Sequence, residues 1–238
     1  PQKNIIIAEQ HSKATIIEQH INYNSSNKTL LTNSTQIHLK ENSSIEYIII
    51  QDVHNENYII NNLYSYLNKN SNLNKYILSL NGQLIRNNTY TFLDQENSSL
   101  NIYGLYLPKN KQHIDNFTFI KHNHSYTQSN QLFRSVCNDS ATAVFSGKIY
   151  VNKNCQKINA IQNNNNIILT NSANVNTKPH LEIYSNDVKC SHGATVGQLD
   201  NDAIFYMQTR GLSYQQAQNL LIKAFIYKTY ETLSSNII

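Results

Sequence analysis

The sequence is poor in the residues that cross-link or bend a chain: its 238 residues include no Trp, three Cys, three Pro and six Gly. The cysteines, Cys137, Cys155 and Cys190, are odd in number and far apart, which argues against a disulfide framework and favours a reducing compartment. The first residues, PQKNIIIAEQ, lack the pattern of a secretory leader. We therefore expect a cytoplasmic, bacterial protein; the Asn-, Ile- and Lys-rich composition makes a plastid or apicoplast stroma the alternative.

Charge and long apolar runs are also scarce. Charged residues make up 14% of the chain, the net charge is only +4, and Lys and Arg do not cluster, so no nucleic-acid partner is expected. The longest apolar run, around residues 48–50, is far too short to span a bilayer, so no membrane partner is expected either. No glycine-rich loop followed by Lys and Ser or Thr is present, which excludes a common class of nucleotide site.

What the chain has instead is a repeat. A polar Asn-Ser corner precedes an alternating apolar run in KENSSIEYIII (40–50), NKNSNLNKYIL (68–78) and QENSSLNIYGL (95–105). The asparagines Asn42, Asn70 and Asn97 lie 28 and 27 residues apart, and a fixed period of this length is typical of stacked repeats. Within the first run, Ile45, Tyr47 and Ile49 share one strand face, and Asn tolerates the left-handed backbone of tight corners. The pattern favours a β-solenoid and a β-sandwich about equally.

The last part of the chain has helical spacing. In DNDAIFYMQTRG, Asp200 or Asn201 is suited to cap a helix, and Gly211 is suited to end it. The following segment, SYQQAQNLLIKAFIYKTYETL, begins with a capping box made by Ser213 and Gln216. We therefore expect a β domain over residues 1–199 and a helical hairpin over residues 200–238.

The segment DVKCSHGATVGQLD (187–200) carries the clearest candidate chemistry. Cys190 and His192 are two residues apart, so on a strand they share a face and can reach one soft or borderline metal. Two ligands do not complete such a site, which suggests a half-site finished by another surface. Ser191 points to the opposite face, which excludes a Ser-His dyad, and no oxyanion hole supports a cysteine hydrolase. Taken alone, a buried structural Cys and a hydrogen-bonded His are the simpler reading.

Two other groups of polar residues are weaker candidates. In TKPHLEIYSNDV, Glu182 shares a strand face with His180 and Tyr184 and is predicted either to support the Cys/His pair from behind or to lie in solvent. In KHNHS, His122 and His124 have no matching pair of cysteines.

The segment TKPHLEIYSNDVKCSHGATVGQLDNDAIFYMQTRGL (177–212) resembles the C-terminal signature of the SufB/SufD family of SUF iron–sulfur cluster assembly proteins. It follows the SufD form rather than the acidic HEATTSKI-type ending of SufB. The resemblance continues through GLYLPKNKQHIDNFT (104–118), AVFSGKIYV (143–151) and QKINAIQNNNNIILT (156–170), and so covers most of the chain.

The resemblance implies a mainly β protein with a right-handed parallel β-helix core and a C-terminal helical hairpin. It implies a non-catalytic scaffold subunit that pairs with SufB through the β-helix and docks the ATPase SufC through the helices. A transient iron–sulfur cluster would be shared with SufB, with none bound by this chain alone. It places His192 at the cluster-assembly interface, with Cys190 beside it. The SufC side would include Phe205, Tyr206, Arg210 and Leu212. Family members usually carry a further N-terminal helical segment, which this chain does not display.

Three alternatives remain open from the sequence. Many parallel β-helices act on polysaccharides with clustered acidic residues, but the 15 Asp and Glu here form no obvious cluster. A stand-alone zinc protein would need further ligands, and a SufB-like paralogue is the third alternative.

Overall fold

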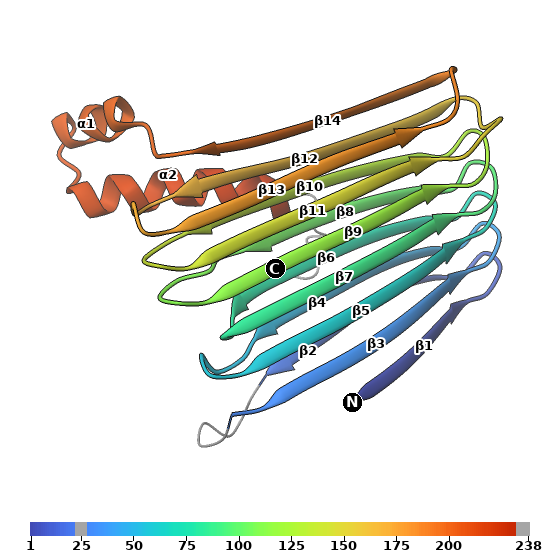
Figure 1. Ribbon diagram of the computed structural model, residues 1–238, viewed down its shortest axis with the longest axis horizontal. Helices are drawn as coiled ribbons and strands as arrows, with labels where there is room; N and C mark the ends of the chain where they lie inside the picture. The colour runs from blue at the N-terminus through green and yellow to red at the C-terminus, as the bar shows by residue number, and fades with distance from the viewer. Residues whose placement is uncertain (22–27, 232–238) are drawn as a thin grey trace.

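The computed structural model describes residues 1–21 and 28–231, which form two seven-stranded parallel sheets and two helices (Figure 1). The odd-numbered strands form sheet A, in the order β1 (Gln2–Ala8), β3 (Leu30–Leu39), β5 (Tyr58–Leu67), β7 (Leu84–Leu93), β9 (His113–His122), β11 (Thr142–Val151) and β13 (Asn174–Ile183). The even-numbered strands form sheet B: β2 (Lys13–Ile21), β4 (Ser44–Asp52), β6 (Asn72–Asn81), β8 (Ser99–Tyr106), β10 (Gln128–Cys137), β12 (Ile158–Ile168) and β14 (Val188–Gly197).

The chain alternates between the sheets, so each turn of the solenoid adds one strand to each sheet. Every pairing is parallel, and neighbours in a sheet are separated in sequence by a strand of the other sheet. A sandwich of hairpins would instead pair consecutive strands antiparallel. The structure therefore confirms the parallel β-helix with C-terminal helices and decides against the sandwich, which the alternating pattern alone had left equally open.

Left-handed asparagines make the corners, as the repeat predicts. Asn42, Asn70 and Asn97 have φ angles of 59°, 54° and 58°. Their side chains also form a ladder on the surface: Asn70 Nδ2 donates to Asn42 Oδ1 at 2.9 Å, and Asn97 Nδ2 donates to Asn70 Oδ1 at 3.1 Å. Each corner thus fixes the backbone turn and also registers one turn of the solenoid on the next.

The core fills the space between the sheets with inward-facing side chains. Ile45, Tyr47 and Ile49 are all buried there, as the strand pattern predicts. Ile48 is buried as well, although it faces outward; it lies beside Tyr76, its partner in the neighbouring strand, which is also buried on the outer side. Parts of the outer face of sheet B are therefore as well shielded from solvent as the interior.

The interior also holds polar side chains in register. Four buried asparagines occupy matching positions on consecutive strands of sheet A, at Asn33, Asn61, Asn87 and Asn116. Asn87 Nδ2 donates to Asn116 Oδ1 at 3.0 Å, and Asn33 Nδ2 donates to Asn61 Oδ1 at 3.2 Å. These bonds satisfy part of the hydrogen-bonding capacity of amides that would be costly to bury alone, while Asn33 Oδ1 and Asn116 Nδ2 have no partner among the described residues.

A lysine is also buried inside the solenoid. Lys75 is fully enclosed, and its ammonium donates to Thr91 Oγ1 at 2.9 Å. Burial lowers the Lys75 pKa to about 7, because the charged form loses its hydration inside the solenoid.

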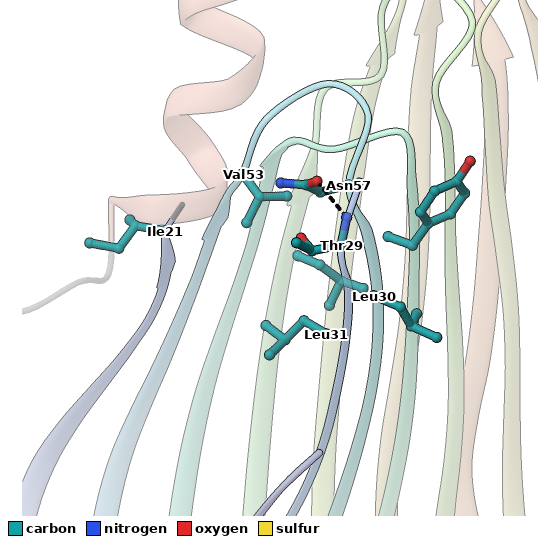
Figure 2. Close-up of a pocket in the computed structure, with 8 residues that line it drawn as sticks. Ile21, Thr29, Leu30, Leu31, Val53 and Asn57 are labelled. Carbon is teal, nitrogen blue, oxygen red and sulfur yellow. Dashed lines mark hydrogen bonds between the residues drawn. The ribbon is translucent and has the colours of Figure 1, made fainter. Parts of the chain in front are cut away.

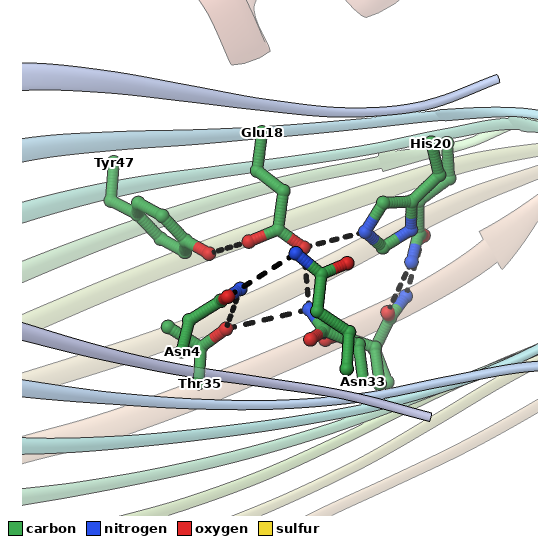
Figure 3. A network of polar contacts seen from close by, with 10 residues as sticks. Asn4, Glu18, His20, Asn33, Thr35 and Tyr47 are labelled. Carbon is green, nitrogen blue, oxygen red and sulfur yellow. Dashed lines mark hydrogen bonds and ion pairs between the residues drawn. The ribbon is translucent and has the colours of Figure 1, made fainter.

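A polar network lies in the first turn of the solenoid (Figure 3). The Glu18 carboxylate accepts hydrogen bonds from the Tyr47 hydroxyl, from Asn33 Nδ2 at 2.5 Å and from His20 Nε2 at 2.5 Å. Burial opposes ionisation of Glu18, but the bonds from His20 and Tyr47 outweigh it and hold its pKa below the usual value. The carboxylate is therefore saturated by the chain's own donors.

The two predicted helices are present with the predicted caps. The Asp200 side chain caps α1 (Asn201–Thr209), Gly211 follows with a φ of 94°, and Ser213 and Gln216 form the capping box of α2 (Tyr214–Tyr230). No helix within residues 1–21 and 28–231 is long and apolar enough to cross a membrane.

The second helix is fastened to the solenoid. It contacts β8 and β10 of sheet B, where the Arg134 guanidinium donates to the Phe225 carbonyl and lies 4.7 Å from the Phe225 ring centroid. The predicted boundary at residues 199 and 200 falls in the link between β14 and α1. The division into two domains stays a prediction, and residues 232–238 of the second domain lie outside the described residues.

Candidate functional site

Cys190 and His192 lie on β14, the last strand of sheet B. This strand pairs only with β12 among the described strands, with Cys190 opposite Ala160 and His192 opposite Gln162. Ala160 and Gln162 are buried in the interior, so Cys190 and His192 also lie on the inner face. No described strand stacks above them, and consequently His192 is exposed and Cys190 half-buried. The structure brings the two side chains to one face at the open end of the solenoid.

The floor beneath His192 is a fixed pair of amides. Gln162 Oε1 accepts from Gln131 Nε2 at 3.2 Å, and Gln162 Nε2 donates to the Gly147 carbonyl at 3.2 Å. A Cβ atom at Gly147 would lie only 2.6 Å from Gln162 Nε2, so a side chain at this position would displace the Gln162 amide. We did not predict this floor, although one signal was present in AVFSGKIYV: a glycine stands at an inward position between Phe145 and Ile149.

The thiol is held in its protonated form. Partial burial raises the pKa of Cys190 above its usual value, and a hydrogen bond with the Ala160 backbone offsets only part of that effect. A metal or cluster would therefore have to displace a proton before Cys190 became a ligand.

Glu182 does not join this pair. It lies on β13, on the outer face of sheet A, where its carboxylate forms an ion pair with Lys148 and accepts from the Tyr184 hydroxyl at 2.8 Å. These bonds lower its pKa, with the Lys148 bond contributing most. The strand pattern gave the face shared by Glu182 and Tyr184 correctly. It did not indicate that this face looks away from the solenoid interior.

The two histidines of KHNHS are also separated. His122 is buried, with Nδ1 2.8 Å from Thr127 Oγ1 and Nε2 2.9 Å from Ser129 Oγ, whereas His124 is exposed at the corner. Burial lowers the His122 pKa to about 3, so the ring is neutral at ordinary pH. Within the described residues, no group of three or more His, Cys, Asp and Glu side chains is placed to hold a metal ion.

The helices next to the site carry exposed aromatic residues. The exposed fractions of Phe205 and Tyr206 are 68% and 58%. The Arg210 guanidinium lies 5.2 Å from the Tyr206 ring centroid, and Leu212 is half-buried in the link to α2. Tyr206 and Arg210 thus lie together beyond the end of β14, and the Phe205 ring is exposed on the same helix.

A hollow at the other end of the solenoid offers no comparable chemistry. Its described lining is mostly apolar and includes Ile21, Leu30, Leu31 and Val53 (Figure 2). Its polar contact is a hydrogen bond from the Thr29 backbone N–H to Asn57 Oδ1 at 3.0 Å.

Comparison with known proteins agrees with this architecture. The family model described as "SUF system FeS cluster assembly, SufBD core domain" matches residues 1–225. The chain is 43% identical over 154 residues to the iron-sulfur cluster assembly protein SufD of Escherichia coli, covering 65% of this chain and 36% of that protein. It is 28% identical over 231 residues to SufD of Plasmodium falciparum, covering 97% of this chain and 16% of that protein.

A third relative is the chloroplastic protein ABCI7 of Arabidopsis thaliana, 35% identical over 149 residues that cover 62% of this chain and 31% of that protein. The chain thus spans about a third or less of the length of these three relatives. The match of the family model to nearly the whole chain shows that it belongs to the SufBD core domain family of the SUF iron–sulfur cluster assembly system.

Proposed function

We propose that this chain is a SufD-type scaffold subunit whose β14 end forms half of an iron–sulfur cluster assembly site, with a SufB-type paralogue supplying the other half. One observation carries the proposal. The solenoid stops with a thiol and an imidazole facing out of an uncovered interior, at Cys190 and His192. A soft-metal site needs more ligands than these two, and the space for them is the open end itself.

The strand edge supplies the means of pairing. Because β14 pairs with β12 alone among the described strands, its other edge presents backbone N–H and C=O groups to a partner strand. A strand added there would lie about 4.8 Å from β14. The partner's inner-face residues would then face Cys190 and His192, while Gln162 holds the floor from below.

The helices would serve a different partner. The exposed rings of Phe205 and Tyr206 are suited to an apolar groove, and we assign them, with Arg210 and Leu212, to contact with the ATPase SufC. Nucleotide chemistry would belong to SufC, so this chain's part is to transmit a movement to the β14 end. The contact of Arg134 on β10 with Phe225 supports this role, because it links α2 to the solenoid.

In this proposal the chain catalyses no reaction, and the cluster is cargo shared with SufB. The compartment is the bacterial cytoplasm or the stroma of a plastid; the chloroplastic name of one relative supports the second.

The test is co-expression of the chain with SufB and SufC, followed by anaerobic cluster reconstitution. His192→Ala should leave the complex intact by size-exclusion chromatography but reduce cluster absorbance at least tenfold. His180→Ala is the matched control, because His180 is exposed on the outer face of β13. Normal cluster yield in the His192 variant, or equal loss in both variants, would refute the site.

The helix assignment is tested separately. Phe205→Ala combined with Tyr206→Ala should release SufC from the purified complex while SufB stays bound. Retention of SufC at wild-type stoichiometry would reject the assignment.

A further inference from the structure

The outer face of sheet A is lined by aromatic side chains in register. Six half-buried rings from three consecutive strands, β5, β7 and β9, define what we call the aromatic face: Tyr64, Tyr66, Tyr90, Phe92, Phe117 and Phe119. The Tyr64 and Tyr90 ring centroids are 4.9 Å apart with planes at 7°, and those of Tyr66 and Phe92 are 5.2 Å apart at 10°. The parallel rings are stacked on one another, so they present edges rather than faces to solvent.

Nothing in the described chain covers this face. Figure 1 looks onto sheet A, and the described helices lie at one end, with α2 packed against β8 and β10 of the opposite sheet. On the first strand, Ile5 and Ile7 are exposed on the same face, with exposed fractions of 59% and 56%, and Gln36 and His38 of β3 lie between them and the rings. On sheet B, the outward Leu105 and Val136 are buried, whereas Ile17 and Ile161 are exposed singly.

Each column of rings leads into a lysine. In the strand register, Tyr66 and Phe92 are followed by Lys121, and Tyr90 and Phe119 are followed by Lys148. Lys178 on β13 adds a third cation. Lys148 is neutralised by Glu182, but Lys121 and Lys178 have no carboxylate partner among the described residues. The two ring columns are therefore aromatic over β5–β9, with Gln36 and His38 before them on β3, and the surface is cationic over β9–β13.

We infer that the aromatic face docks an amphipathic helix of another protein, apolar along one side and acidic at the end that lies over β9–β13. Charge complementarity selects this partner, because Lys121 and Lys178, which have no carboxylate partner among the described residues, attract carboxylates. Seven strands at about 4.8 Å spacing span roughly 29 Å. A helix of about 19 residues has that length.

Two other occupants fit less well. A second copy of this chain would bring its own Lys121 and Lys178 to the same surface, and the like charges would repel. A single-stranded nucleic acid is held by bases that stack on ring faces, but stacking within the sheet already occupies those faces.

The test uses the whole chain and defined probes. A fluorescent 20-residue helical peptide with an apolar stripe and glutamates in one half is compared, by fluorescence anisotropy, with the same peptide carrying lysines instead. The acidic peptide should bind and the basic one should not. Lys121→Glu combined with Lys178→Glu should weaken acidic-peptide binding about tenfold or more and admit the basic peptide.

The matched control is Lys13→Glu combined with Lys153→Glu, which makes the same charge change at exposed positions off the aromatic face and should bind like wild type. Equal binding of both peptides, no binding of either, or an unchanged affinity in the Lys121/Lys178 variant would overturn the inference. Anionic phospholipid vesicles and oligo-dT are tested in the same way. If either binds through Lys121 and Lys178 while the acidic peptide does not bind, the inference is also overturned. These binding measurements do not depend on cluster formation, so failure of this inference can be told apart from failure of the proposed function.

Discussion

Replacing Lys75 by Met should stabilise the protein at neutral and acidic pH and remove a pH dependence of its stability. The folded-state pKa of about 7 lies far below the 10.5 of an unperturbed lysine. At about 1.4 kcal/mol for each pH unit between the two values, the buried charge costs the fold roughly 5 kcal/mol. Thr91 loses its donor in the variant, which returns about 1 kcal/mol of that gain.

The direction of the pH effect follows from proton binding. Below pH 7 both the folded and the unfolded chain carry a charged Lys75, so the full cost is present. Between pH 7 and 10.5 the unfolded chain binds more protons than the folded one, so the free energy of unfolding rises with pH. Above that range both forms are neutral and the cost is gone.

The assay is urea unfolding of wild type and K75M at several pH values across this range. The difference between their free energies of unfolding is compared, because the contributions of titrating tyrosines and cysteines are the same in both proteins and cancel. The advantage of K75M should be several kcal/mol at acidic pH and shrink as the pH rises. Lys109→Met, at an exposed corner lysine, should run parallel to wild type. Parallel pH profiles for K75M and wild type would refute the account of Lys75 as a desolvated, unpaired charge.

Three further predictions concern the same solenoid. His122→Gln should flatten the loss of stability that wild type shows as the pH falls from 6.5 toward 3, because only the unfolded chain protonates His122 in that range; equal acid slopes would contradict this. Gly104→Ala should lower stability by about 1–3 kcal/mol, since its Cβ would lie 2.1 Å from the Phe133 ring, whereas Gly197→Ala meets no atom within 4 Å and should be neutral in thermal unfolding. Asn70→Ala should be about 1–2 kcal/mol less stable than Asn70→Gly, because both lose the asparagine ladder but only Ala strains the left-handed corner; equal melting temperatures would reject that cause.

Local features of this fold were predictable from the sequence. The corners at Asn42, Asn70 and Asn97 follow from the left-handed tolerance of asparagine, and the caps at Asp200 and Ser213 follow from hydrogen bonding within a few residues. The alternation of Ile45, Tyr47 and Ile49 gives one buried face in any sheet. Such signals are carried by neighbouring residues, so they need no knowledge of the partner strand.

What depends on distant partners was not predictable. Parallel stacking and a sandwich produce the same alternation, and only the resemblance to the SufB/SufD family pointed to the first. Lys75 looks like a surface residue until the neighbouring turns enclose it. Likewise, nothing local distinguishes the inward side of Cys190 and His192 from the outward side of Glu182. The Gln131–Gln162 floor joins two strands of sheet B that are adjacent only after folding.

The in-register stacking means that the number of turns fixes the length of the solenoid. Every turn advances the structure by one strand spacing, so the distance from the first turn to the β14 end changes only in steps of about 4.8 Å. Loss of one residue within a strand would turn every later side chain of that strand inside out. Loss of a whole turn, such as the 28 residues from Asn42 through Lys69, would keep the inward pattern and shorten the solenoid by one strand spacing. Changes in the length of the sequence are thus expected as whole turns or as longer corners. The number of turns then sets the distance between the first turn and β14.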